Sequence, residues 1–165
     1  MHPEAHAFVQ SVVERTHHPR KALELGAYNV NGHCRGLFPS VTEWYGIDLR
    51  PGPNVDETAN AETWKPQKRY DLVLCTEVLE HARHPEAIVE TAHKALRKKG
   101  FFIMTCATTG RAPHSNDGAH SGFKDYYRNI TLTEMDDWLR HSGFRILRLE
   151  QNRQACDLYA LAKRL

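Results

Sequence analysis

Short apolar runs alternate along the chain with stretches whose apolar residues recur at helical spacing. Seven runs have the composition of β-strands: 22–25, 44–49, 54–56, 71–76, 101–107, 144–150 and 156–163. Leu72–Cys75 and Phe101–Met104 are continuously apolar, which is typical of strands buried on both faces. Strands that alternate with helices predict a parallel sheet.

The last two strands are an exception to this parallel arrangement. Only residues 151–155 separate them, and a parallel crossover needs a dozen residues or more. We therefore expect this final pair to be antiparallel.

Two helices are predicted in the first hundred residues. Apolar positions within 8–13 recur at helical spacing, and this helix should end before Pro19. A second helix should begin with Pro85 and end at Gly100, with the basic residues 97–99 in its last turn.

A third helix should open at Thr131, because Glu134 stands at the spacing of a capping box, and Gly143 should end it. Together, these elements predict an α/β fold. Its sheet would be Rossmann-like, mostly parallel and seven-stranded, with a C-terminal antiparallel hairpin and helices on both faces.

Composition limits the class of protein. The chain has 165 residues, of which 41% are apolar and 25% are charged, so we expect residues 1–165 to form a single domain. The net charge of +2, with both signs interspersed, gives no reason to expect a nucleic-acid or membrane partner.

The cysteines and the N-terminus favour a cytoplasmic protein. The four cysteines are far apart in the sequence, and two of them lie inside predicted strands, where thiols usually act as small hydrophobic groups. The first residues lack the apolar stretch of a secretory signal, and no run is long enough to span a membrane.

The first predicted strand ends in a glycine-bearing turn of a kind that can bind a ligand. In the stretch 22–32, Glu24 is followed by Gly26 and Gly32, and Asp48 ends the second strand. A glycine turn that leads into a helix leaves backbone N–H groups and space for a ligand, and a carboxylate at the next strand end can accept hydrogen bonds from ribose hydroxyls. We therefore expect a nucleoside-cofactor site.

Four segments occur in a recognisable order: ALELGAYNVNG, YGIDLRPGPNVD, YDLVLCTEVLEH and LRKKGFFIMT. This order resembles class I S-adenosylmethionine-dependent methyltransferases, particularly small stand-alone members. The resemblance runs from about Lys21 to the end of the chain. It implies a methyltransferase that uses S-adenosyl-L-methionine.

The resemblance also implies roles for particular residues. Glu24 would approach the amino-acid part of the cofactor, Asp48 would bind the ribose and Leu49 would pack on the adenine. The full implied cofactor-binding set is Glu24, Gly26, Asn31, Gly32, Asp48, Leu49, Asn60, Ala61, Thr76 and Glu77. Tyr28 departs from the pattern, because many members have a further glycine there, so the turn should be longer or differently shaped.

Candidate catalytic groups lie in two places. The segment 108–129 follows the fifth predicted strand and carries His120, so we expect it to be a substrate lid. His81 would also lie near the cofactor, and either histidine could be a general base, although a structural role for His81 is an equal alternative. Glu80 is expected to be a surface acid or a helix-start residue.

No metal site is expected. The histidine pairs 17–18, 81–84 and 114–120 lack the accompanying Cys or Asp spacing of a zinc site.

The expected acceptor is a small molecule methylated on oxygen or nitrogen. Thr76–Leu79 stands where enzymes that methylate adenine or glutamine amino groups carry an Asp/Asn-Pro-Pro-aromatic tetrad. Loops or a homodimer interface would recognise the acceptor. Two alternatives stay open: a methyltransferase-like protein that binds the cofactor without turnover, and an NAD-dependent oxidoreductase.

Overall fold

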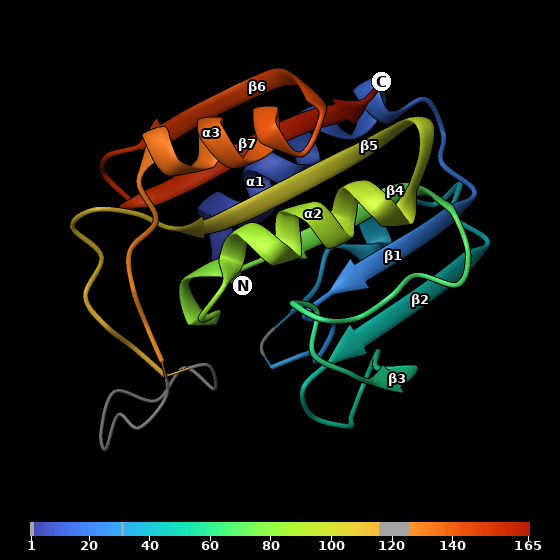
Figure 1. Ribbon diagram of the computed structural model, residues 1–165, viewed down its shortest axis with the longest axis horizontal. Helices are drawn as coiled ribbons and strands as arrows, with labels where there is room; N and C mark the ends of the chain where they lie inside the picture. Colours follow the sequence, from blue (N-terminus) through green and yellow to red (C-terminus); the bar gives the residue numbers. More distant parts are fainter. Residues whose placement is uncertain (1, 31, 116–125) are drawn as a thin grey trace.

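The computed structural model describes residues 2–30, 32–115 and 126–165 (Figure 1). Within these residues a sheet of seven strands has the order β3-β2-β1-β4-β5-β7-β6. The strands are β1 (Lys21–Leu25), β2 (Glu43–Asp48), β3 (Glu57–Thr58), β4 (Tyr70–Thr76), β5 (Leu96–Ala107), β6 (Phe144–Asn152) and β7 (Asp157–Arg164). The helices are α1 (Pro3–Val12), α2 (Pro85–Ala95) and α3 (Leu132–His141).

Strands β1 to β5 pair in parallel, whereas β7 runs antiparallel to both β5 and β6. This confirms the predicted parallel sheet with a C-terminal antiparallel hairpin. The arrowheads of β1, β2 and β5 point to the left of Figure 1, and β3 and β4 run parallel to them. The loops after β1, β2, β4 and β5 are therefore brought together at one edge.

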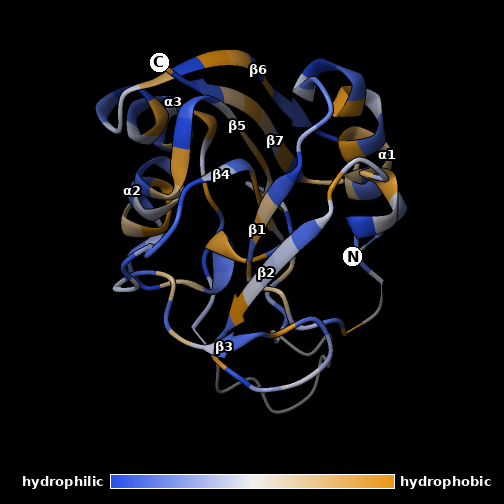
Figure 2. Cartoon of the chain, turned by 90° about the vertical axis from the view of Figure 1, so that its right-hand side faces the viewer, coloured by the Kyte–Doolittle hydropathy of each residue, from blue (hydrophilic) through white to orange (hydrophobic). Residues whose placement is uncertain are grey.

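Helices cover both faces of the sheet, as expected (Figure 2). The buried face of α1, which includes Phe8, packs on one side, where the Phe8 ring stacks on Tyr159 with centroids 4.8 Å apart. Helices α2 and α3 pack on the other side, with Val89 and Leu139 in the core. Residues 70–75 of β4 are all buried, which confirms that this apolar run is covered on both faces.

The start of α3 has the predicted capping box. Thr131 Oγ1 accepts a hydrogen bond from Glu134 N at 3.3 Å, and Glu134 Oε2 accepts one from Thr131 N at 2.9 Å. These bonds satisfy N–H groups that a helix leaves unpaired in its first turn.

The predicted end of α2 at Gly100 is wrong. The helix stops at Ala95, and the basic residues 97–99 already belong to β5. Leu96 has an extended backbone and pairs with Tyr70 of β4, while Arg164 donates to the carbonyl of His93 at 2.9 Å. Long-range pairing therefore ends the helix before its local stop signal.

The first glycine turn does not lead into an α-helix in the described residues. Between β1 and β2 they contain only the short 3₁₀ helix Arg35–Leu37. Tyr28 N donates to Asp48 Oδ2 at 3.0 Å and Asn29 N to the Pro53 carbonyl at 3.2 Å, so the loop is held open along the end of β2.

Strand β3 follows the predicted run 54–56 instead of coinciding with it. Asn54 has a left-handed backbone with φ of 71°, which a strand does not accommodate. Pairing with β2 therefore begins only at Glu57.

No helix in the described part of the chain is both long and apolar enough to cross a membrane.

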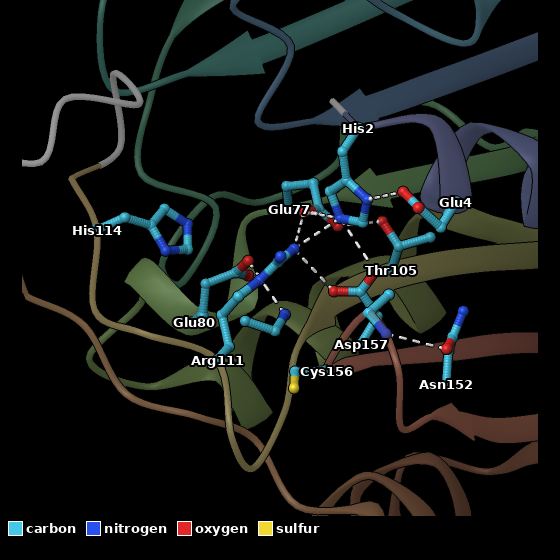
Figure 3. Close-up of polar contacts among 12 residues, drawn as sticks. His2, Glu4, Glu77, Glu80, Thr105, Arg111, His114, Asn152, Cys156 and Asp157 are labelled. Atoms are coloured by element: carbon cyan, nitrogen blue, oxygen red, sulfur yellow. Dashed lines mark hydrogen bonds and ion pairs between the residues drawn. The ribbon is translucent and has the colours of Figure 1, made fainter.

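A group of four charged side chains, His2, Glu77, Arg111 and Asp157, ties the start of α1 to the sheet (Figure 3). His2 Nε2 lies 3.0 Å from both Glu77 Oε2 and Asp157 Oδ2. Arg111 Nη2 lies 2.9 Å from Asp157 Oδ1. We call this set the His2 cluster.

The His2 cluster favours a charged imidazole. Hydrogen bonds to Asp157 and then Glu77 raise the pKa of His2 to about 10, against the opposing effect of burial. Arg111 Nη2 also lies 2.8 Å from His2 Nε2, which is unfavourable when both groups donate. Two carboxylates at Nε2 outweigh this contact, since Arg111 has its own partner in Asp157.

Replacing His2 by alanine should remove a pH-dependent part of the free energy of unfolding. The pKa of His2 is about 10 in the fold against 6.5 as the unperturbed value, so its ionic contribution is complete below pH 6.5 and is lost as the pH rises toward 10. Urea unfolding measured between pH 6.5 and pH 10 should show that the difference in free energy of unfolding between the wild type and His2→Ala decreases as the pH rises. His6→Ala, on the same helix but outside the cluster, is the control. Parallel stability curves for the wild type and His2→Ala would contradict the assignment.

Candidate functional site

A cavity of about 850 Å³ opens at the carboxyl edge of the parallel strands. This is within the usual size of small-molecule sites, and the edge is where open α/β sheets bind ligands. Every described residue expected from the sequence lines it: Glu24, Gly26, Gly32, Asp48, Leu49, Asn60, Ala61, Thr76, Glu77 and His81. Asn31 and His120 lie outside the described residues, as do residues 116–125 of the expected lid segment.

Gly26 allows the loop after β1 to lie against the segment after β4. Its φ is +76°, and a Cβ added there would stand 2.2 Å from Cγ2 of Val78. Both the backbone angle and the close contact exclude a side chain. The backbone N–H groups of Gly26 and Ala27 donate to the Ile47 carbonyl, which fixes this turn beside β2.

Tyr28, at the position of the absent glycine, packs against the loop after β2 and lines the cavity. A Cβ added at Gly52 would lie 2.2 Å from the Tyr28 ring, and the Arg50 guanidinium lies 4.7 Å from the centre of that ring. The larger residue is therefore accommodated by a glycine on the neighbouring loop.

Glu24 is almost fully buried at the end of β1 and already has a charged partner. Its Oε2 lies 2.8 Å from Arg35 Nε, and Arg35 also donates to the Asn54 carbonyl at 2.7 Å. Burial raises the pKa of Glu24, although Arg35 opposes that shift. The carboxylate can still accept further hydrogen bonds on its remaining lone pairs.

Asp48 stands at the end of β2 with both oxygens oriented by backbone. Its Oδ2 accepts from Tyr28 N at 3.0 Å and its Oδ1 from Arg50 N at 3.2 Å. The neighbouring Leu49 side chain is 65% exposed, and Val30, across the cavity mouth, is 45% exposed. Exposed apolar groups beside a fixed carboxylate suit a ligand with a flat ring and a polyhydroxyl part.

Asn60 has a structural role besides the expected one. Its Oδ1 accepts a hydrogen bond from Glu62 N at 2.9 Å, which shapes the turn that carries Ala61 into the cavity wall. One lone pair of Oδ1 and the side-chain amino group stay available to a ligand.

Glu77 adopts an uncommon backbone at the end of β4. Its φ is 59°, its N–H donates to the Thr105 carbonyl at 2.8 Å, and its Oε1 accepts from Thr105 Oγ1 at 2.8 Å. Burial would raise the pKa of Glu77, but the hydrogen bond and the charge of His2 outweigh it and lower that pKa. Left-handed, non-glycine residues held by their surroundings are frequent at functional sites.

The expectation that Glu80 is a surface acid is wrong, because its side chain is completely buried. The alternative of a helix-start residue agrees with its place in the first turn of the 3₁₀ helix Leu79–His81. Oε1 accepts from Ala107 N at 3.1 Å, whereas Oε2 has no hydrogen-bond donor among the described residues. Burial is the largest cause and the negative charge of Glu77 the second, and together they raise the pKa of Glu80 to about 8.

Among the lining residues, His2, Arg111 and His114 were not predicted as site residues, although Arg111 and His114 lie within the predicted lid segment. His2 and Arg111 are held at the cavity by Glu77, directly after β4, and by Asp157 of β7, so no local motif marks them. The ring of His114 packs edge-on against His81, with centroids 5.1 Å apart. His114 is close to His120 in the sequence, whereas the fold places it next to His81.

A known protein with a related sequence is named as a methyltransferase. The Marinobacter nauticus protein named ubiquinone biosynthesis O-methyltransferase is 26% identical over 144 residues, which cover 78% of this chain. The match spans only 60% of the length of that relative.

Two solved structures share the fold. The Burkholderia thailandensis 1,6-didemethyltoxoflavin-N1-methyltransferase, with its substrate and S-adenosylhomocysteine bound, has a TM-score of 0.72 at 17% identity, over 97% of this chain and 78% of that one. The N-methyltransferase NodS of Bradyrhizobium japonicum, in complex with S-adenosylhomocysteine, has a TM-score of 0.71 at 14% identity, over 98% and 86% of the two chains.

A family model described as "Methyltransferase domain" matches residues 1–149. That match takes in α1 and β1 to β5, and therefore all the described residues that line the cavity. The chain belongs to the methyltransferase domain family.

Proposed function

We propose that this chain transfers a methyl group from S-adenosyl-L-methionine to a hydroxyl or amino group of a small molecule. The observation that carries the proposal is the cavity at the carboxyl edge, whose lining contains all the described residues that the sequence marks for this cofactor. Family membership and the S-adenosylhomocysteine in related structures support it.

The residues of the cavity fit the cofactor. Asp48 would accept hydrogen bonds from the ribose hydroxyls, and the exposed Leu49 would cover one face of the adenine. Asn60 would contact the adenine edge, while Glu24 would lie toward the amino-acid part. The cofactor supplies a methyl carbon on a positively charged sulfur.

The chain has to align the acceptor and exclude water, because methyl transfer is an in-line displacement. The acceptor end of the cavity is lined by His81, Arg111, His114 and Tyr126, which follow β4 and β5. His81 is the described candidate for a proton acceptor, and the role proposed for His120 depends on a segment outside the described residues. A histidine at this place can act as the general base that takes the acceptor's proton.

The proposal includes a single domain that works in the cytoplasm on a small molecule and not on nucleic acid. The four cysteines form no disulfide in the described part of the chain, and the net charge is only +2. A homodimer interface could complete the acceptor side of the cavity.

S-adenosylhomocysteine should raise the thermal stability of the protein. At a free concentration 100-fold above its Kd the gain should be about 2.7 kcal/mol, because the ligand binds only the folded chain. Differential scanning calorimetry with S-adenosylhomocysteine and with NAD measures this directly. A shift with NAD and none with S-adenosylhomocysteine would favour the oxidoreductase and overturn the proposal. Binding without methyl consumption across a metabolite panel would favour the alternative of a binding protein without turnover.

Asp48→Ala should weaken S-adenosylhomocysteine binding by about 1.5–3 kcal/mol, since a charged acceptor for the ribose hydroxyls is lost. Isothermal titration calorimetry gives this value. Asp137→Ala, at an exposed position of α3, is the matched control and should bind like the wild type. Equal affinity of Asp48→Ala and the wild type would show that the ribose binds elsewhere.

A further inference from the structure

Two groups of side chains in the described residues could hold a metal ion by their geometry. One is the set His2, Glu77 and Asp157, and the other is Glu80, His81 and His114. In each group the three candidate ligand atoms all lie within 4.8 Å of one another. Figure 3 shows His114 and Glu80 on one side of Arg111, and His2 with Asp157 on the other.

The first group has its charges already balanced. His2 lies 3.0 Å from each carboxylate, and Arg111 lies 2.9 Å from Asp157. A cation there would have to displace the imidazolium and approach the guanidinium, which like-charge repulsion opposes.

The second group is not balanced in this way. The Glu80 side chain is completely buried, and its Oε2 has no donor among the described residues. A buried carboxylate oxygen without a partner is costly, so such an atom indicates either a bound proton or a bound cation.

His114 is oriented as metal-binding histidines usually are. Its Nδ1 lies 3.1 Å from the Ala112 carbonyl, so this nitrogen carries the hydrogen and the Nε2 lone pair is available. A hydrogen bond from the second ring nitrogen to a backbone carbonyl is the common way to fix a ligating imidazole.

We propose that Glu80, His81 and His114 bind a divalent transition-metal ion that holds the hydroxyl of the acceptor beside the cofactor. Two imidazoles and one carboxylate suit Zn²⁺, Mn²⁺ or Fe²⁺ better than Mg²⁺, and three protein ligands leave positions open for a substrate. His81 and His114 line the cavity, so these open positions face the acceptor.

This inference rests on the proposed methyl transfer and narrows its acceptor to a hydroxyl compound. A cation lowers the pKa of a hydroxyl that it binds, so the proton passes to water. The oxygen then attacks the methyl carbon, and the carbon–sulfur bond breaks with its electron pair going to sulfur. The products are a methyl ether, S-adenosylhomocysteine and one proton.

The test is titration of the untagged full chain, stripped with a chelator and desalted, with ZnCl₂ and separately with MgCl₂. Isothermal titration calorimetry should show one equivalent of Zn²⁺ bound more tightly than Mg²⁺. His114→Ala and Glu80→Gln should each weaken Zn²⁺ binding by about 100-fold or more. His141→Ala is the matched control, because its Nδ1 also contacts a backbone carbonyl, at 2.7 Å, but it belongs to neither group.

The outcomes separate the metal site from the proposed function. No saturable Zn²⁺ binding by the wild type, or wild-type affinity in His114→Ala and Glu80→Gln, would overturn the metal site. Loss of binding in His2→Ala with retention in His114→Ala would place the ion in the first group and also overturn it. S-adenosylhomocysteine binding by the same variants reports on folding and on the cofactor site, so a failure of the proposed function appears there and not in the Zn²⁺ titration.

Discussion

The partly buried carboxylate of Glu77 organises the floor of the site. Its backbone turns into the left-handed region directly after β4, and its two oxygens are held by Thr105 of β5 and by His2 at the start of α1. His2 in turn contacts Asp157 at the start of β7. Glu77 and His2 together thus link three strand ends to the N-terminal helix, and the turn that follows Glu77 carries Val78 against Gly26. The walls of the cavity depend on this arrangement.

The distribution of charge around that floor is uneven. Glu77 and Asp157 are offset by His2 and Arg111, and Glu24 is offset by Arg35. Such compensation lets carboxylates remain charged where burial alone would protonate them. Glu80 lacks a compensating partner among the described residues, and it lies next to His81 and His114, which line the cavity. Under the proposed function, the cofactor and acceptor ends of the cavity therefore differ in their electrostatic character.

Much of this site could be predicted because it lies at strand ends. The apolar runs mark β1, β2 and β4, and Glu24, Asp48 and Glu77 stand at or directly after their last residues, so the parallel sheet brings them to one edge. His2, Arg111 and the burial of Glu80 could not be predicted in this way, because they depend on contacts between segments distant in the sequence. The same cause explains the end of α2. Gly100 and the preceding basic residues are a valid local stop signal, but the pairing of Leu96 with Tyr70 already ends the helix at Ala95.

The central claim is that the carboxyl edge of the parallel strands is the cofactor site. A crystal structure of the protein grown with S-adenosylhomocysteine tests it most directly. The account predicts the ribose hydroxyls within hydrogen-bonding distance of Asp48, the adenine against Leu49 and the sulfur near Thr76 and Glu77. Ligand density elsewhere on the molecule, with the cavity between Gly26 and Asp48 filled only by water, would contradict it.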